Sequence, residues 1–186
     1  MRVRHCTGPL LDFALPRVWF RSSAVPEGLI ESHPAVDRVR AALAAAGVPA
    51  AIVALPDAAR TARAAADAIG CDVAQIANSL VFRCESSGVP LLVMTSGANR
   101  VDTARVAALV GEPIGKADAA FVRAATGFAI GGVAPVGHVA PVRTLIDRDL
   151  FRHAEIWAAA GHPHTVFRLS PDALVRLTGG TVVEVT

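Results

Sequence analysis

Residues 79–95 read SLVFRCESSGVPLLVMT, and this stretch decides which fold the chain can adopt. Ser79–Cys84 and Pro90–Thr95 are rich in apolar and β-branched residues, and the polar segment Glu85–Gly88 ends in a glycine. Two strand-like runs joined by a short glycine-containing turn indicate a β-hairpin. We therefore expect a sheet that contains this hairpin.

Segments on both sides of the hairpin have helical or strand patterns. Ser32 is a suitable N-cap before Pro34, and Val36, Val39 and Leu43 share one face of a helix that stops at Gly47. The further expected elements are strands at Ala50–Leu55, Val142–Ile146, Glu155–Ala159, Thr165–Leu169 and Thr181–Val185, and helices at Thr61–Ile69, Asp102–Val110, Asp118–Ala125 and from Ser170 onward. Because no regular βαβ period connects them, a mixed α/β (α+β) fold is favoured over a Rossmann layout, with packed helices and a central mixed, partly closed β-sheet.

The composition indicates one folded domain. The chain has 186 residues, of which 53% are hydrophobic and 18% are charged, so enough apolar surface is available to offset chain entropy. Residues 1–30 show no sustained period and contain three prolines. We expect them to form an N-terminal extension, with a flexible segment as one alternative. Residues 31–186 are then expected to form the domain.

Membrane and metal-bound classes are disfavoured. The longest uncharged stretch, Ala41–Leu55, contains Gly47 and Pro49 and is shorter than the roughly 20 residues of a spanning helix. We expect no membrane association and a cytoplasmic protein. The three cysteines, Cys6, Cys71 and Cys84, match no zinc spacing.

Two other catalytic constellations are weak. His138, His162 and His164 could together bind a metal, but no Asp or Glu stands at a familiar ligand spacing. Ser96–Gly97 lacks the G-x-S-x-G pattern of a nucleophilic serine. The net charge of +2 is far below that of a dedicated nucleic-acid coat, which leaves transient nucleic-acid contact open.

Several separate segments carry a family resemblance in the same order. Gly131–Gly137 reads GGVAPVG, Ser96–Asp102 reads SGANRVD, and Gln75–Arg83 reads QIANSLVFR; Gly161–Pro163 and Ser170–Leu174 follow. Together they resemble the YbaK family, the prolyl-tRNA synthetase-associated editing domains, over about residues 32–186.

The resemblance implies a free-standing hydrolase of mischarged aminoacyl-tRNA, with no metal or cofactor. Its partner would be the acceptor end of aminoacyl-tRNA, and an aminoacyl-tRNA synthetase is a further implied partner. Hydrolysis of the ester needs donors for the charge that develops on the carbonyl oxygen, and backbone N–H groups can supply them. Glycines let a ligand approach the backbone, so Gly131 and Gly132 are the first candidates for contact with the carbonyl or the ribose.

Further candidate residues follow from the same resemblance. Val133 and Pro135 belong to the glycine-rich loop, His162 would lie at the rim of the pocket, and Arg100 could reach a phosphate. These four are expected to bind the substrate.

One position departs from the family pattern. The family usually has lysine where this chain has Asn78, so a positive charge is absent. One hypothesis is an editing hydrolase in which Asn78 and Ser79 position the aminoacyl group. The alternative is a catalytically silent protein that binds aminoacyl-tRNA or a related aminoacyl or nucleotide ligand.

Overall fold

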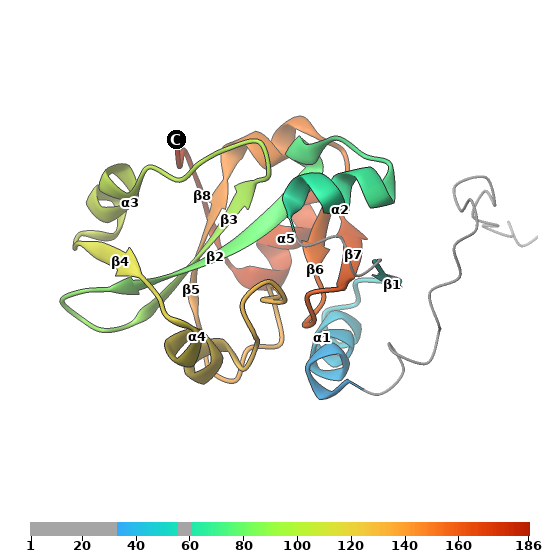
Figure 1. Ribbon diagram of the computed structural model, residues 1–186, viewed down its shortest axis with the longest axis horizontal. Helices are drawn as coiled ribbons and strands as arrows, with labels where there is room; N and C mark the ends of the chain where they lie inside the picture. The colour runs from blue at the N-terminus through green and yellow to red at the C-terminus, as the bar shows by residue number, and fades with distance from the viewer. Residues whose placement is uncertain (1–32, 56–60) are drawn as a thin grey trace, which may run out of the picture.

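The computed structural model describes residues 33–55 and 61–186 (Figure 1). The extension expected at residues 1–30 lies outside the described residues. Within them, a single mixed sheet of eight strands is combined with five α-helices. The expected mixed α/β fold is therefore confirmed.

The sheet has the order β1-β7-β6-β2-β3-β5-β8, with β4 pairing separately with β2. The pairs β2–β3, β2–β4, β6–β7 and β1–β7 are antiparallel, and β2–β6, β3–β5 and β5–β8 are parallel. The strand bounds are β1 Ile52–Ala54, β2 Ile76–Cys84, β3 Pro90–Ser96, β4 Ile114–Lys116, β5 Arg143–Asp147, β6 Ile156–Ala159, β7 Thr165–Leu169 and β8 Thr181–Val183.

The helices begin and end at the residues that local chemistry favours. Their bounds are α1 Pro34–Ala45, α2 Ala62–Ile69, α3 Thr103–Val110, α4 Ala119–Thr126 and α5 Pro171–Thr178, with 3₁₀ turns η2 Val73–Gln75 and η3 Arg148–Arg152. Thr61, Asp102 and Asp118 cap the starts of α2, α3 and α4 by accepting backbone N–H groups. For α1 the N-cap is His33, one residue after the expected Ser32.

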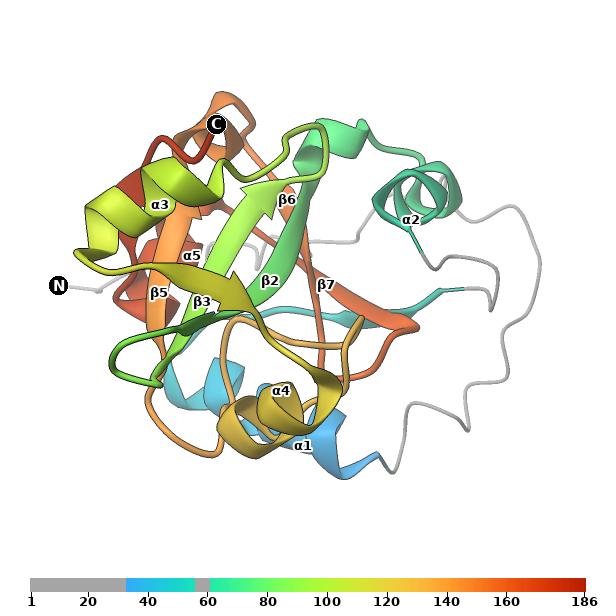
Figure 2. The same ribbon diagram turned by 60° about the vertical axis from the view of Figure 1, so that its left-hand side comes forward.

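The two faces of the sheet are covered by different helices. Along β3, Leu92 and Met94 belong to one buried cluster and Leu91 and Val93 to another, because successive side chains of a strand alternate between faces. The first cluster includes residues of α1, α4 and α5. We define the opposite face, which carries α2 and α3, as the outer face; Figure 2 shows α2 and α3 on one side of the sheet and α1 and α4 on the other.

Strand β4 is absent from the sequence-based prediction. It has three residues, Ile114, Gly115 and Lys116, which are too few to show a period. Lys116, two residues before the N-cap of α4, is paired with Phe82 of β2. No helix in the described ranges, 33–55 and 61–186, is long and apolar enough to cross a membrane.

Candidate functional site

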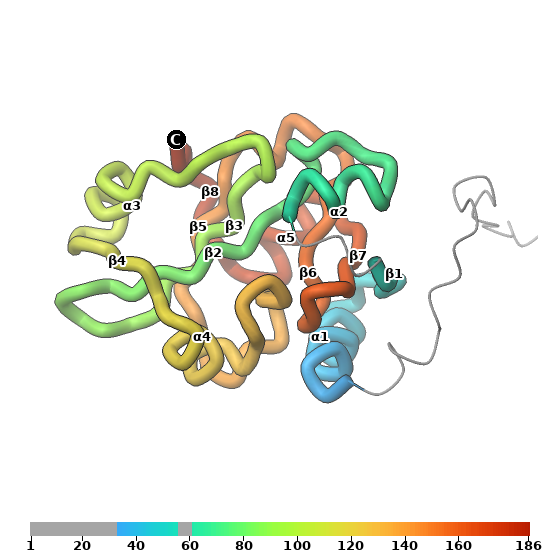
Figure 3. Tube along the Cα trace, viewed as in Figure 1, coloured from blue at the N-terminus to red at the C-terminus, as the bar shows by residue number. Residues whose placement is uncertain are grey.

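One edge of β2 is only partly covered by neighbouring strands. On this side β6 pairs with β2 as far as Ala77, and β4 pairs with it from Phe82 onward. Figure 3 shows β2 running away from β6 after this short contact. The residues between the two contacts, 78–81, have a strand partner on the β3 side only, and we call them the open edge of β2.

The backbone groups of Ser79 point away from β3 at this open edge. The amide of Gly97 donates to the Ile76 carbonyl on the β3 side, and the amide of Glu85 donates to the Pro113 carbonyl on the β4 side. In an antiparallel ladder the N–H and C=O of one residue point the same way, and successive residues alternate. Ser79 is in phase with Glu85, so both of its backbone groups face the open edge.

Asn78 lies at the start of the open edge, on the outer face. Its side chain is half-buried, and its partner on β3 is Thr95. On the same face, Ile76, two residues before Asn78, packs against α2, and Phe82, four residues after it, packs against the cluster beneath α3. Leu80 is 38% exposed, so the outer face is uncovered between the two helices where Asn78 stands.

The glycine-rich loop packs against the turn after β6. Gly131 has φ +88°, in the left-handed region. A Cβ atom on Gly132 would lie 2.8 Å from the carbonyl carbon of His162 and 2.9 Å from Pro163 N, so only glycine permits this approach. In Figure 1 the loop lies below β2, between α4 and α1. The structure thus brings Gly131 and Gly132 close to the turn that contains His162, and all three are candidate site residues.

The loop presents backbone donors that the protein does not use. Gly132 N–H donates to the Ala129 carbonyl. Within the described part of the chain, the N–H groups of Gly131, Val133 and Ala134 donate to no protein acceptor. Val133 is 3% exposed, and buried N–H groups are normally paired with protein, water or ligand. These donors suit a ligand oxygen.

The side chains of Val133 and Pro135 face inward. Both residues are buried, and Val133 belongs to the main core together with Ala77 of β2. Any contact of these two residues with a substrate is therefore made by backbone atoms. Pro135 also lines a shallow cavity of about 470 Å³ on the α1 and α5 side of the loop.

His162 is held as a hydrogen-bond donor. Its Nδ1 accepts the His164 amide at 3.2 Å, which assigns the proton of the neutral ring to Nε2. Burial lowers the pKa of His162, and the His33 and His164 rings lower it further. The His33 ring centroid is 5.0 Å from that of His162. His162 is therefore neutral at pH 7, and its Nε2–H takes no part in the hydrogen bond with His164.

The three histidines considered as a metal site are not all together. His138 Nε2 lies 2.7 Å from the Ala134 carbonyl and its ring packs edge-on against Phe128. His162 instead neighbours His33 and His164. Among the described residues, no group of three or more His, Cys, Asp or Glu side chains is arranged to hold a metal ion.

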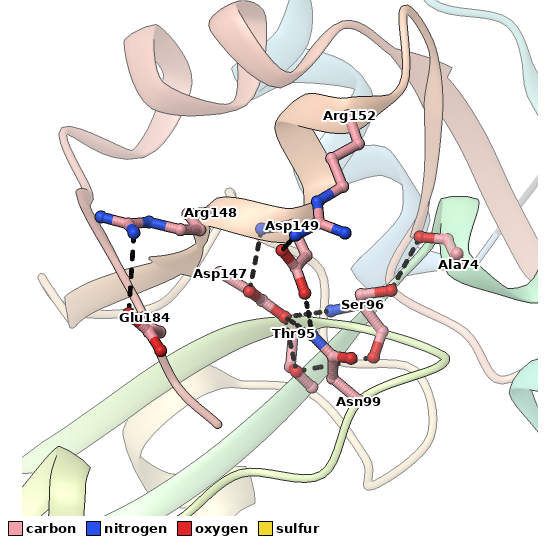
Figure 4. A network of polar contacts seen from close by, with 9 residues as sticks. All are labelled: Ala74, Thr95, Ser96, Asn99, Asp147, Arg148, Asp149, Arg152 and Glu184. Atoms are coloured by element: carbon pink, nitrogen blue, oxygen red, sulfur yellow. Dashed lines mark hydrogen bonds and ion pairs between the residues drawn. The ribbon is translucent and has the colours of Figure 1, made fainter.

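Sequence reasoning missed a buried carboxylate behind Asn78. Asp147 is 2% exposed, and its Oδ2 accepts from Thr95 Oγ1, the Ser96 amide and Asn99 Nδ2 at 2.9–3.2 Å (Figure 4). Since Thr95 is the strand partner of Asn78, this network fixes the end of β3 next to the site. An acidic residue directly after an apolar strand was the available signal.

Arg100 is placed in the turn that follows this network. It is exposed, and it makes no ion pair within the described residues. The structure does not bring Arg100 into contact with the glycine-rich loop. Its suggested role at a phosphate stays a prediction.

Comparison with known proteins agrees with this arrangement. The family described as the aminoacyl-tRNA editing domain matches residues 56–177, more than half of the chain. The chain belongs to this family. The resemblance inferred from the sequence motifs is thereby confirmed.

Relatives of this editing domain include proteins of known structure. A protein proposed as a trans-editing enzyme for prolyl tRNA synthetase is 43% identical, with a TM-score of 0.79 over 83% of this chain and 98% of that chain. The hypothetical protein APE2540 is 26% identical, with a TM-score of 0.74 over 80% and 98% of the two chains. The uncharacterized protein YwhH of Bacillus subtilis (strain 168) is 30% identical over 114 residues, 61% of this chain and 72% of YwhH.

Proposed function

We propose that this chain is a trans-editing hydrolase that removes the amino acid from mischarged aminoacyl-tRNA. The observation that carries the proposal is the glycine-rich loop, whose Gly131 and Val133 N–H groups have no protein acceptor in the described residues and which packs against His162. The family and the 43% identical relative support an editing role in general.

The loop would act on the reacting carbonyl. Water attacks the ester carbon, the carbonyl oxygen gains negative charge, and collapse of the tetrahedral intermediate releases the free amino acid and the ribose 3′-hydroxyl. Preorganised N–H donors stabilise such an oxygen without reorganising during the reaction. Gly131 and Val133 are the residues of this chain that offer them.

His162 would assist the leaving group rather than activate water. A general base needs a free lone pair, but the Nδ1 lone pair of His162 accepts the His164 amide. Nε2–H can donate to the ribose oxygen that departs. Because the pKa of His162 is lowered by burial, this donor is a neutral ring at physiological pH.

Asn78 would position the aminoacyl group in place of the lysine usual in the family. Its carboxamide can donate, but a neutral hydrogen bond contributes about 0.5–1.5 kcal/mol net, against about 1.5–3 kcal/mol for a bond to a charged group. We expect a slower or differently selective deacylase than one with lysine. The acceptor end of aminoacyl-tRNA is the partner in this proposal.

Asn78 also favours one competing function. Without a charge at position 78, the domain could bind an aminoacyl or nucleotide ligand and leave it intact. Asn78→Lys separates the two: a silent wild type whose Asn78→Lys variant hydrolyses substrate would establish the binder.

The test is deacylation of tRNAs charged with alanine, serine, threonine or cysteine. We expect wild-type protein to hydrolyse at least one ester and Gly131→Ala to lose most of this activity. Gly111→Ala is the matched control, because Gly111 has the same φ of +88° and open space around its Cα but ends α3. Equal activity of the two variants would count against the loop's role.

A further inference from the structure

We propose that the open backbone of Ser79 binds the aminoacyl group itself: its carbonyl accepts from the α-ammonium and its N–H donates to the ester carbonyl. This inference rests on the proposed function, since it assumes an aminoacyl ligand at this site. The backbone of Ser79 is proposed here rather than its side chain, because the Ser79 hydroxyl donates to Met94 Sδ at 3.3 Å.

The positive charge on the substrate requires a hydrogen-bond acceptor, and the segments around the open edge contain no carboxylate to provide one. An aminoacyl ester carries an ammonium group on its α-carbon. The open edge, the glycine-rich loop and the β6–β7 region lie within residues 77–81, 128–141 and 156–166, and these ranges contain no Asp or Glu. Backbone carbonyls are therefore acceptors available there, together with the side-chain oxygen of Asn78.

Three carbonyls in and beside the loop already accept hydrogen bonds from the protein. The Ala129 carbonyl accepts from Gly132 N–H, and the Ala134 carbonyl from His138 Nε2. The His162 carbonyl accepts from the Thr165 amide and hydroxyl. The Ser79 carbonyl, in contrast, faces the part of the β2 edge that neither β6 nor β4 covers.

The geometry of one antiparallel residue pair matches an α-amino acid. Two paired residues exchange two hydrogen bonds, each giving its N–H to the other's carbonyl. An aminoacyl group has a donor and a carbonyl in the same relative positions as one such residue. Seated on Ser79, it would present its ester carbon beside Asn78 on the same strand.

A pair of matched ligands tests the ammonium contact. The probes are adenosine analogues whose 3′-oxygen is replaced by nitrogen, one carrying alanine and the other lactate, so that the stable amides differ only by an ammonium in place of a hydroxyl. We expect the alanyl analogue to bind at least about tenfold more tightly, as a hydrogen bond to a charged group implies. Equal affinities, or binding of neither analogue, would overturn the inference.

Backbone variants test the location. Ser79→Pro removes an N–H that β3 does not use and places the proline ring at the open edge, where an edge strand tolerates it. We expect a folded protein that binds the alanyl analogue at least about tenfold more weakly than Ser79→Ala does, because Ser79→Ala keeps the backbone N–H. Wild-type affinity in folded Ser79→Pro would refute the assignment.

A spectroscopic measurement keeps the test independent of that variant's folding. In wild-type protein the Ser79 amide resonance should shift on addition of the alanyl analogue, and the lactyl analogue should shift it less at equal concentration. An unmoved Ser79 amide would contradict the contact. Hydrolysis of charged tRNA without alanyl–lactyl discrimination would sink this inference and leave the editing proposal standing; discrimination without hydrolysis would do the reverse.

Discussion

Gly132 and His162 meet backbone to backbone, since a Cβ at position 132 would lie 2.8 Å from the His162 carbonyl carbon and 2.9 Å from its Cα. This contact joins two segments that are 30 positions apart in the chain. It ties the loop that offers N–H donors to the turn that offers the His162 ring. The spacing between the loop's N–H donors and the His162 ring therefore depends on glycine, which has no side chain, at position 132.

Gly132→Ala should damage both stability and function. The methyl group meets backbone rather than a movable side chain, and overpacking of this kind costs about 1–3 kcal/mol. Urea denaturation and deacylation measured on the same preparation would show both losses. An active variant of wild-type stability would mean that the loop and the turn separate without consequence.

Asn78→Ala should weaken catalysis with little effect on folding. Loss of a neutral hydrogen bond worth about 0.5–1.5 kcal/mol corresponds to a fall of about 2- to 13-fold in kcat/KM. Leu80→Ala, on the same exposed face, is a control for removal of side-chain volume. Unchanged kcat/KM in Asn78→Ala would remove this residue from the site.

Amide hydrogen exchange should reveal the open edge without any ligand. Asn78 and Leu80 direct their N–H groups to β3, whereas Ser79 does not, and unpaired amides exchange from the native state. Ser79 should therefore exchange faster than both neighbours. Equal protection of all three would show that another group covers this edge.

The hairpin, the helix caps and the glycine loop were predictable because each depends on neighbouring residues. Asp102 before α3 and Gly111 after it are local signals. The two apolar, β-branched runs on either side of Gly88 form the antiparallel hairpin that their composition indicates. The family resemblance also implied that the turn containing His162 lies at the rim of the same pocket as the glycine-rich loop.

The open edge could not be predicted in this way. It arises because β6 leaves β2 after Ala77 and the three-residue β4 joins only at Phe82, and both are pairings between distant segments. Likewise, nothing in the sequence around Asp147 indicates that Thr95 and Asn99 converge on its carboxylate. Non-local pairing, not residue preference, determines these features.

Stability should fall as the pH is lowered, with His138 as one cause. Burial lowers the pKa of His138 below its ordinary value of 6.5. The unfolded chain then binds a proton more readily than the folded one, so stability present above about pH 6.5 is lost as the pH falls through the lower pKa of the folded state. Melting temperatures between pH 8 and pH 5 would measure this, with both limits chosen about 1.5 units from that value.

His138→Gln isolates the contribution of this ring. Glutamine can still donate to the Ala134 carbonyl but does not titrate. The variant should lose less stability than wild type over the same pH interval. An identical pH dependence would assign the effect to other groups, such as His162, whose pKa is also lowered by burial.

Lys116→Ala should reduce the salt dependence of tRNA binding. Its pairing with Phe82 puts it on the outer face with Asn78, four residues along β2 or about 13 Å away at about 3.3 Å per residue. A phosphate contact there would lower the slope of log K against log salt by about one. Arg176→Ala is the control, since α5 packs on the opposite face; equal slopes would exclude Lys116.

An exposed sheet edge usually invites a second polypeptide and so carries a risk of aggregation. Here the uncovered part of β2 is limited to residues 78–81, because it ends at β6 in one direction and at β4 in the other. A boundary of this kind would limit pairing with a second chain, and it would also disfavour peptidyl-tRNA, whose longer nascent chain needs an edge that continues. Selection between a single amino acid and a growing peptide would then follow from where two neighbouring strands stop.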